Sequence, residues 1–118
     1  MIIIKGRIPS KKNSRQTIYN KGRCLSIPSK RYNEWHEDAS WQLKEQKVKF
    51  YENAVAMRIV FFAPDNRNAD LTNKAESVMD MLVDNGIIKD DNWFVIKSIG
   101  LIFAGIDKDN PRVEIEIL

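Results

Sequence analysis

Apolar residues recur along the chain at two different spacings, one typical of helices and one typical of strands. Over residues 32–47 and 70–83 they return every three to four positions, which predicts two amphipathic helices. Ser29 can cap the first helix, and Asn85-Gly86 is typical of the C-terminal end of the second. These are the two main helices that we expect.

Other segments favour strands, because β-branched and aromatic residues are frequent in them and apolar positions alternate with polar ones. The segment 54–62 is predicted to be the central strand. A turn at 107–111 separates the last two segments, so we expect a hairpin that closes the chain. The turn residues Asn20-Lys21-Gly22 predict a short hairpin. The predicted strands are residues 2–8, 16–19, 23–27, 54–62, 93–104 and 112–118.

The order of these elements is strand, small hairpin, helix, strand, helix, strand, strand. It predicts a two-layer α+β fold, in which two main helices pack against a mixed β-sheet. The chain has 118 residues, which allows one domain and leaves little room for a second. We therefore expect a single domain over residues 1–118.

The composition is that of an ordinary folded protein, with 43% hydrophobic and 30% charged residues. The longest mostly apolar stretch, residues 54–64, is far shorter than the ~20 residues that span a bilayer. Residues 1–5 lack the pattern of a signal peptide. Cys24 is the one cysteine, which excludes a disulfide within the chain and a zinc site built on cysteines. We expect no membrane insertion and a reducing, cytoplasmic location.

Charge is divided unevenly along the chain. Residues 1–31 contain nine basic residues and no acidic one, whereas residues 32–118 contain ten basic and sixteen acidic residues. A basic segment attracts nucleic acid phosphates, and clustered carboxylates are stable together when a divalent cation lies between them. This division favours a protein that binds a polyanion and a metal ion. The alternative is a solvated basic surface without a ligand.

Carboxylates stand on both sides of the second predicted helix. Asp70 falls in its first turn, and Asp90-Asp91 follow it in a loop. A helix of this length spans roughly 20 Å, so these groups meet only if the loop returns along a strand or comes from a neighbouring chain. The alternative is that Asp70 interacts with the helix dipole and that Asp90-Asp91 form a polar turn.

The residues around these acids resemble the signature of the RusA-type Holliday junction resolvases. The run Asp70-Leu71-Thr72-Asn73-Lys74-Ala75-Glu76-Ser77-Val78-Met79-Asp80-Met81-Leu82 is similar to the Asp-x-Asp-Asn motif and following helix of that family. The run Gly86-Ile87-Ile88-Lys89-Asp90-Asp91 is similar to its Gly-x-x-x-Asp-Asp segment, and Pro9-Ser10-Lys11-Lys12-Asn13-Ser14 to an early loop. The resemblance covers most of the chain. It implies a RusA-like fold and a small, dimeric, metal-dependent endonuclease, of a kind often carried by phages and prophages, that cuts four-way DNA junctions with paired nicks.

The resemblance also implies roles for single residues. Asp70 and Asp91, with Asp90 beside the latter, match the catalytic carboxylates. The sequence departs from the family at Thr72, where a second carboxylate is usual, and at Glu76, where lysine is usual. Positions 72 and 76 share a helical face, so Glu76 could partly replace the missing carboxylate. A surface salt bridge of Glu76 is the alternative.

Phosphodiester hydrolysis needs an activated water and a neutralised leaving oxygen, and carboxylates hold Mg²⁺ for both tasks. The predicted metal ligands are Asp70, Asp90, Asp91 and Glu76, with Mn²⁺ as a possible substitute for Mg²⁺. Lys74, one turn from Asp70, would stabilise charge on the phosphate or neutralise the acids. Paired nicks need two active sites, and so a homodimer. The residues predicted to hold the backbone of branched double-stranded DNA are Lys11, Lys12, Asn13, Arg15, Lys30 and Arg67.

Two other functions compete with this one. A DNA-junction binding protein with weak or no catalysis would keep the basic segment and the dimer, since Thr72 removes a usual metal ligand. A small basic protein that binds RNA or another protein would show no metal dependence.

Four isolated side chains have simpler expected roles. We expect His36 to pack on the first helix or to contact a partner, because no second histidine or cysteine is near it to complete a metal site. Trp35 and Trp93 are expected in the core or at an interface, and an aromatic wedge at a junction centre is a further alternative for Trp93. Trp41 points away from the apolar face and is expected to be partly exposed or at a subunit contact.

Overall fold

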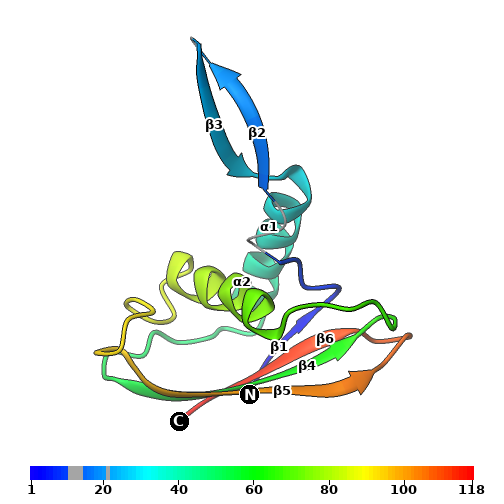
Figure 1. The fold of residues 1–118 in the computed structure, drawn as a ribbon. Coiled ribbons are helices and arrows are strands. Elements are labelled where there is room, and N and C mark those ends of the chain that lie inside the picture. The colour runs from blue at the N-terminus through cyan, green and yellow to red at the C-terminus, as the bar shows by residue number, and fades with distance from the viewer. Residues whose placement is uncertain (11–14, 21) are drawn as a thin grey trace.

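A four-stranded sheet carries both helices on one of its faces in the computed structural model of the protein (Figure 1). The structure describes residues 1–10, 15–20 and 22–118, with the backbone alone over 15–20 and 23–28. This is the predicted two-layer α+β fold with a mixed sheet. The elements are β1 (Ile2–Lys5), β2 (Arg15–Asn20), β3 (Arg23–Pro28), α1 (Lys30–Glu45), β4 (Val55–Ala63), α2 (Leu71–Asp84), β5 (Ile96–Ile106) and β6 (Arg112–Ile117).

The strand order of the large sheet is β1-β6-β4-β5. β4 pairs parallel with β5 and antiparallel with β6, which confirms the prediction that it is a central strand. The predicted closing hairpin is wrong, because β4 lies between the last two strands. The turn after β5 passes over the end of β4, where the N–H of Asp107 donates to the carbonyl of Ala63 at 2.8 Å.

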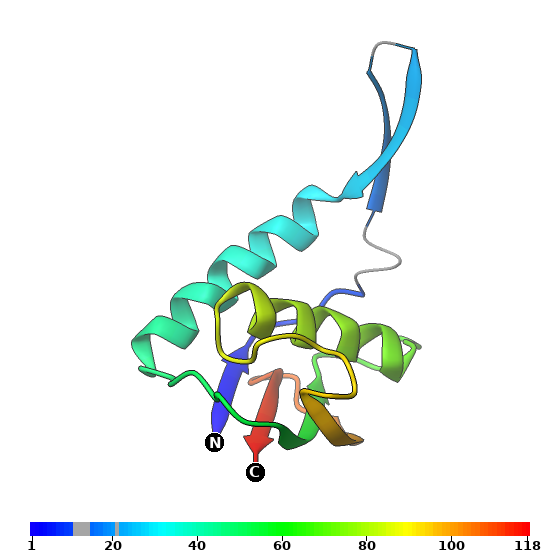
Figure 2. The same cartoon turned by 90° about the vertical axis from the view of Figure 1, so that its left-hand side faces the viewer.

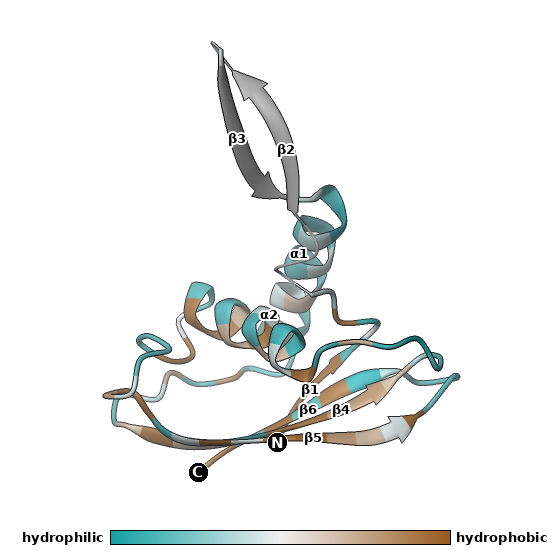
Figure 3. Ribbon diagram, in the orientation of Figure 1, coloured by the Kyte–Doolittle hydropathy of each residue, from teal (hydrophilic) through white to brown (hydrophobic). Residues whose placement is uncertain are grey.

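The core lies between the sheet and the helices. Ser29 caps α1 as predicted, since its side chain accepts a hydrogen bond from the N–H of Tyr32 at 3.2 Å. Hydrophobic residues gather on the strands and on the adjoining side of α2 (Figure 3). No helix among the described residues is long and apolar enough to cross a membrane. The helical core residues are Tyr32, Trp35, Ala39, Leu43, Ala75, Val78, Met81 and Leu82.

Two strands, β1 and β5, differ by three residues at one end from the bounds that the sequence predicts. β1 ends at Lys5 because Gly6 adopts a φ of 110°, which favours glycine and turns the chain. β5 begins three residues later than predicted, because the side-chain oxygen of Asn92 accepts hydrogen bonds from the N–H groups of Phe94 and Val95 and holds them in a turn. Trp93 is consequently 79% exposed and is not a core residue.

The hairpin predicted around residue 21 is confirmed, since β2 and β3 pair antiparallel as a sheet of their own. It projects from the N-terminal end of α1, away from the large sheet (Figures 1 and 2). Trp41, on α1, is exposed, in agreement with its predicted orientation. β2 and β3, which belong to the basic N-terminal part of the chain, therefore form an arm outside the two-layer body.

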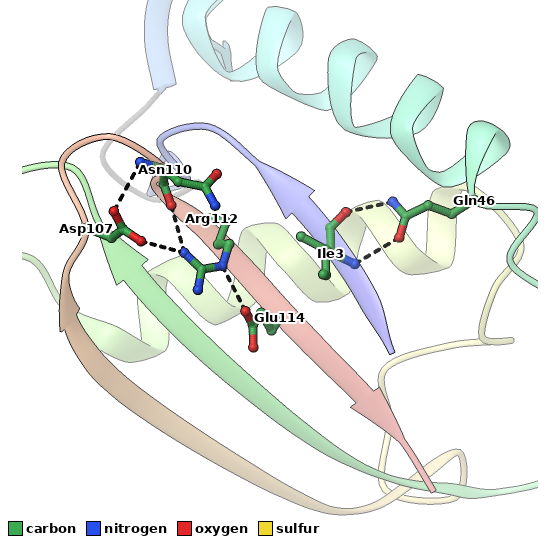
Figure 4. A network of polar contacts seen from close by, with 6 residues as sticks. All are labelled: Ile3, Gln46, Asp107, Asn110, Arg112 and Glu114. Atoms are coloured by element: carbon green, nitrogen blue, oxygen red, sulfur yellow. Dashed lines mark hydrogen bonds and ion pairs between the residues drawn. The ribbon is translucent and has the colours of Figure 1, made fainter.

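The outer edge of β1 is sealed by two glutamines of α1. Gln46 accepts from the N–H of Ile3 at 2.9 Å and donates to its carbonyl at 2.6 Å (Figure 4). Gln42 makes the same pair of bonds with Lys5, at 2.7 and 3.1 Å. Residues four apart on a helix lie about 6 Å from each other, and alternate residues of a strand about 6.7 Å, so the two amides match two successive outward-facing backbone positions.

Candidate functional site

A hollow of about 710 Å³ opens at the C-terminal ends of the parallel strands β4 and β5. Sites in open sheets commonly form at such strand ends, where the loops leave the sheet. Here the N-terminus of α2 also meets the hollow and adds its partial positive charge. Its lining comprises residues 7–10, Arg31, residues 61–71, Lys74, Phe103, Ile106 and Arg112.

The charged lining is mainly basic. Two acidic side chains, Asp65 and Asp70, face it, while the basic ones are more numerous. Such an arrangement attracts an anionic ligand and keeps a carboxylate at hand, which suits a phosphate with a cation beside it. The basic side chains are Arg7, Arg31, Arg67, Lys74 and Arg112.

Asp70 is the N-cap of α2. One of its carboxylate oxygens, Oδ1, accepts from the N–H of Thr72 at 3.0 Å and from the Thr72 hydroxyl at 2.7 Å. Thr72 therefore orients the Asp70 carboxylate. Glu76, one helical turn further, is exposed and lies outside the lining of the hollow.

Lys74 and Ser77 tie α2 to the segment that follows β1. The Lys74 ammonium donates to the carbonyl of Ile8, and the buried Ser77 hydroxyl donates to the carbonyl of Pro9 at 2.6 Å. Burial, and then the nearby charges of Arg7 and Arg31, lower the pKa of Lys74. Sequence reasoning missed Ser77, whose one signal is a polar residue within the apolar stripe of the helix.

Arg7 connects the two segments on either side of the hollow. It forms an ion pair with Asp65, which also accepts from the N–H of Arg67 at 3.1 Å. The backbone bond of Arg67 and the guanidinium of Arg7 lower the pKa of the Asp65 carboxyl. Sequence reasoning counted Arg7 and Arg31 only within the basic segment and did not single them out.

Arg112, which sequence reasoning also missed, is held rigidly at the rim. Its guanidinium donates to Asp107 and to Glu114, both at 2.8 Å (Figure 4), and lies 3.8 Å above the ring centre of Phe62. These two bonds raise its pKa, so the group stays cationic. The alternation of the last strand marked Arg112 only as an outward-facing position.

Asp90 and Asp91 lie far from this hollow within the chain. The loop that holds them follows the other end of α2, and β5 then runs back toward the hollow (Figure 1). An α-helix of this kind spans roughly 20 Å, and neither residue lines the hollow. Asp90 accepts from the N–H of Asp91 at 2.7 Å and from the Asn92 amide at 3.1 Å, as a turn residue does. One chain therefore does not bring Asp70, Asp90 and Asp91 together.

The described residues contain one other group of metal-ligating side chains, His36, Asp80 and Asp84, between α1 and α2. His36 Nε2 lies 2.9 Å from Asp84, and the Tyr32 hydroxyl donates to Asp80 at 2.6 Å. Burial and the Asp80 carboxylate raise the pKa of Tyr32. The His36 ring also contacts the rings of Tyr32 and Trp35, which confirms its predicted packing role.

Three of the residues predicted to contact DNA lie within the part of the chain that the structure describes. Arg67 lines the hollow, and Lys30 is exposed at the start of α1, 3.7 Å from Glu34. Arg15 begins β2. Lys11, Lys12 and Asn13 lie outside the described residues.

The basic hollow with its carboxylate is typical of a protein that binds an anionic ligand such as a phosphate group. The sequence model of the endodeoxyribonuclease RusA family matches residues 7–118. A similar protein is the crossover junction endodeoxyribonuclease RusA of Aquifex aeolicus, which is 29% identical over 87 residues, covering 73% of this chain and 68% of the relative. The chain belongs to the RusA family of endodeoxyribonucleases. Its function is therefore that of a Holliday junction resolving endonuclease, as the resemblance implied.

Proposed function

We propose that the protein works in the cytoplasm as a homodimer that uses Mg²⁺, or Mn²⁺ in its place, to make paired nicks in four-way DNA junctions. The observation that carries this proposal is Asp70, fixed at the N-terminus of α2 within a hollow lined by five basic side chains. A nuclease needs this combination, because the substrate is an anion and the metal needs oxygen ligands.

The donor chemistry fits a hard divalent cation. Asp70 offers a carboxylate at the hollow, whereas Asp65 is already paired with Arg7. Asp90 and Asp91 are the candidates for the further oxygen ligands, and exposed Glu76 is the remaining candidate. When bound, the cation would activate water and neutralise the leaving oxygen.

The chain itself holds and orients the DNA backbone. Arg7, Arg31 and Arg112 present cationic groups around the hollow, and the last is fixed by two carboxylates and an aromatic ring. Lys74 anchors the segment that leads to the basic loop and brings an ammonium close to the phosphate position. Arg67 adds a further cationic group at the hollow. Lys11, Lys12, Asn13, Arg15 and Lys30 are the other residues proposed to hold the DNA backbone.

The test is nicking of a labelled synthetic four-way junction, compared with linear duplex, in Mg²⁺, in Mn²⁺ and with chelator. We expect metal-dependent symmetric nicks in the junction and none in the linear duplex. In Asp70→Asn the nicking rate should fall on the order of 100-fold or more. Asp109→Asn, which removes the same charge from an exposed turn outside the hollow, is the matched control and should cut normally. Tight junction binding without nicks in any metal would show that the protein is a junction binder instead.

A further inference from the structure

Two pairs of side chains, each spaced by four residues, face each other between α1 and α2. Tyr32 and His36 belong to α1, whereas Asp80 and Asp84 belong to α2. The Tyr32 hydroxyl donates to Asp80 at 2.6 Å, and His36 Nε2 lies 2.9 Å from a carboxylate oxygen of Asp84. Residues four apart on a helix share a face, so the register of both helices brings these four side chains together.

Three of these side chains offer the ligand atoms of a metal site. One atom each from His36, Asp80 and Asp84 lies within 4.8 Å of the other two. Ligand atoms of a tetrahedral ion, at ~2.1 Å from it, are about 3.4 Å apart, so the widest separation must shorten by about 1.4 Å at most. The Asp84 side chain is 50% exposed, so a rotation of this side chain can close the site.

The surroundings of these side chains favour a bound cation. Burial, and then the carboxylates of Asp80 and Asp84, raise the pKa of Tyr32. Negative charge has this effect on a phenol, and the same charge attracts a cation. The buried Tyr32 also orients Asp80 through its hydroxyl, as the outer hydrogen-bond partners of metal ligands do.

The types of ligand atom select the kind of ion. Mg²⁺ prefers oxygen ligands, whereas one imidazole nitrogen with two carboxylates suits Zn²⁺ and neighbouring first-row transition metals. Three protein ligands leave the fourth position of a tetrahedral ion to water. The spacing of His36 along the chain could not indicate this set, because both carboxylates come from the other helix.

We infer that His36, Asp80 and Asp84 form a structural Zn²⁺ site that clamps α1 to α2. Asp80 follows Asp70 by ten residues, which is roughly 15 Å along α2, and none of the three ligands lines the hollow. The ion fixes the helix that carries the arm of β2 and β3 to the helix that begins beside Asp70. The inference goes beyond the proposed nuclease function and does not depend on it.

Zn²⁺ binding to the full chain tests the inference without a measurement of cleavage. Asp70→Asn removes the carboxylate of the hollow and serves as the background, and calorimetry measures the stoichiometry and the affinity. We expect one Zn²⁺ per chain and a higher melting temperature in its presence. His36→Gln should weaken this binding on the order of 100-fold, and Tyr32→Phe, which loses the bond to Asp80, on the order of 10-fold.

Two further variants make the comparison specific. Glu37→Gln, at the exposed position next to His36, is the matched control and should bind Zn²⁺ as the background does. Asp84→Asn changes a half-exposed ligand, so it should keep the fold and lose the binding. Circular dichroism without metal checks that each variant is folded.

X-ray absorption spectroscopy of the Zn²⁺-loaded background identifies the ligands directly. We expect the scattering pattern of one imidazole, which should be absent in His36→Gln. The inference would be overturned if the background bound no Zn²⁺, or if His36→Gln and Asp84→Asn bound it with unchanged affinity. A loss of binding in Glu37→Gln as large as that in His36→Gln would also refute it.

Discussion

The two outer strands of the sheet, β1 and β5, differ in what lies against their outer edges. At β1, the amides of Gln42 and Gln46 bond to the outward-facing backbone groups, so another strand would have to displace them. At β5, the neighbouring surface is apolar and uncharged, and Ile99 and Phe103 remain exposed on the core side. The backbone of β1 is thus occupied by side-chain amides on its outer side, whereas β5 has β4 as its one strand neighbour among the described residues.

The largest expected effect comes from a charge on the open edge. Ile102→Lys places an ammonium on β5 at a side chain that is already partly exposed, so the fold should be retained. A charge on an exposed apolar outer strand opposes association through that strand, so we expect the dissociation constant of the proposed homodimer to increase on the order of 100-fold. Analytical ultracentrifugation over a concentration series measures this.

The matched control for that variant is Trp41→Lys. Trp41 is also a large exposed apolar residue, but it lies on α1. Its replacement should leave the dimer dissociation constant within a few-fold of wild type. Equal weakening by both variants would mean that the outer edge of β5 has no particular part in self-association.

A smaller effect is expected from opening the sealed edge. Gln42→Ala with Gln46→Ala removes four hydrogen bonds to β1, although water replaces part of them at this exposed site. We expect the free energy of unfolding in urea to fall by about 1 to 2 kcal/mol. The double variant should also self-associate at high concentration, because the freed edge can pair.

Gln46→Glu is the informative intermediate. A carboxylate can still accept from the N–H of Ile3 but cannot donate to its carbonyl. We therefore expect about half of the fall in the free energy of unfolding that removal of both Gln46 hydrogen bonds causes. If the double alanine variant kept the wild-type stability and stayed free of new association, the amides would have no protective role at β1.

The smallest expected effect is the pH dependence of stability that comes from the ion pair between Arg7 and Asp65. Because Arg67 and Arg7 lower the pKa of Asp65 below its usual 3.8, its stabilisation is present above pH 3.8. It is lost as pH falls through the lowered value, when the folded state must take up the proton. Asp65→Asn should therefore show a shallower loss of stability below pH 4 in acid titrations followed by circular dichroism. An unchanged slope would show that the pair does not contribute.

Most of the local structure could be predicted from the sequence. The periodic apolar faces and the Ser29 cap predicted α1 and α2, and alternation predicted β4 as the central strand. The structural predictions that proved wrong were of two kinds. Gly6 and Asn92 changed the ends of strands through backbone geometry that periodicity does not report. The closing hairpin failed because pairing between distant segments placed β4 between β5 and β6.

The candidate site was predictable by residue type and not by position. The motif marked Asp70, Asp90 and Asp91, and the charge pattern marked the N-terminal segment as basic. Neither the motif nor the charge pattern could show that Arg112 lines the hollow, since this depends on the turn that crosses the end of β4. The anchoring of the segment after β1 by Ser77 likewise depends on a contact between residues 68 positions apart.

The sequence by itself determined the secondary structure, the α+β class and the family, because periodicity, caps and motifs are properties of neighbouring residues. The tertiary structure alone decided the order of the strands, the hollow at the ends of β4 and β5, and the distance between Asp70 and Asp91. It also decided which edge is sealed. These features arise from pairing and packing between segments far apart in the chain, where backbone hydrogen bonds and buried apolar surface choose among arrangements that local patterns leave equal.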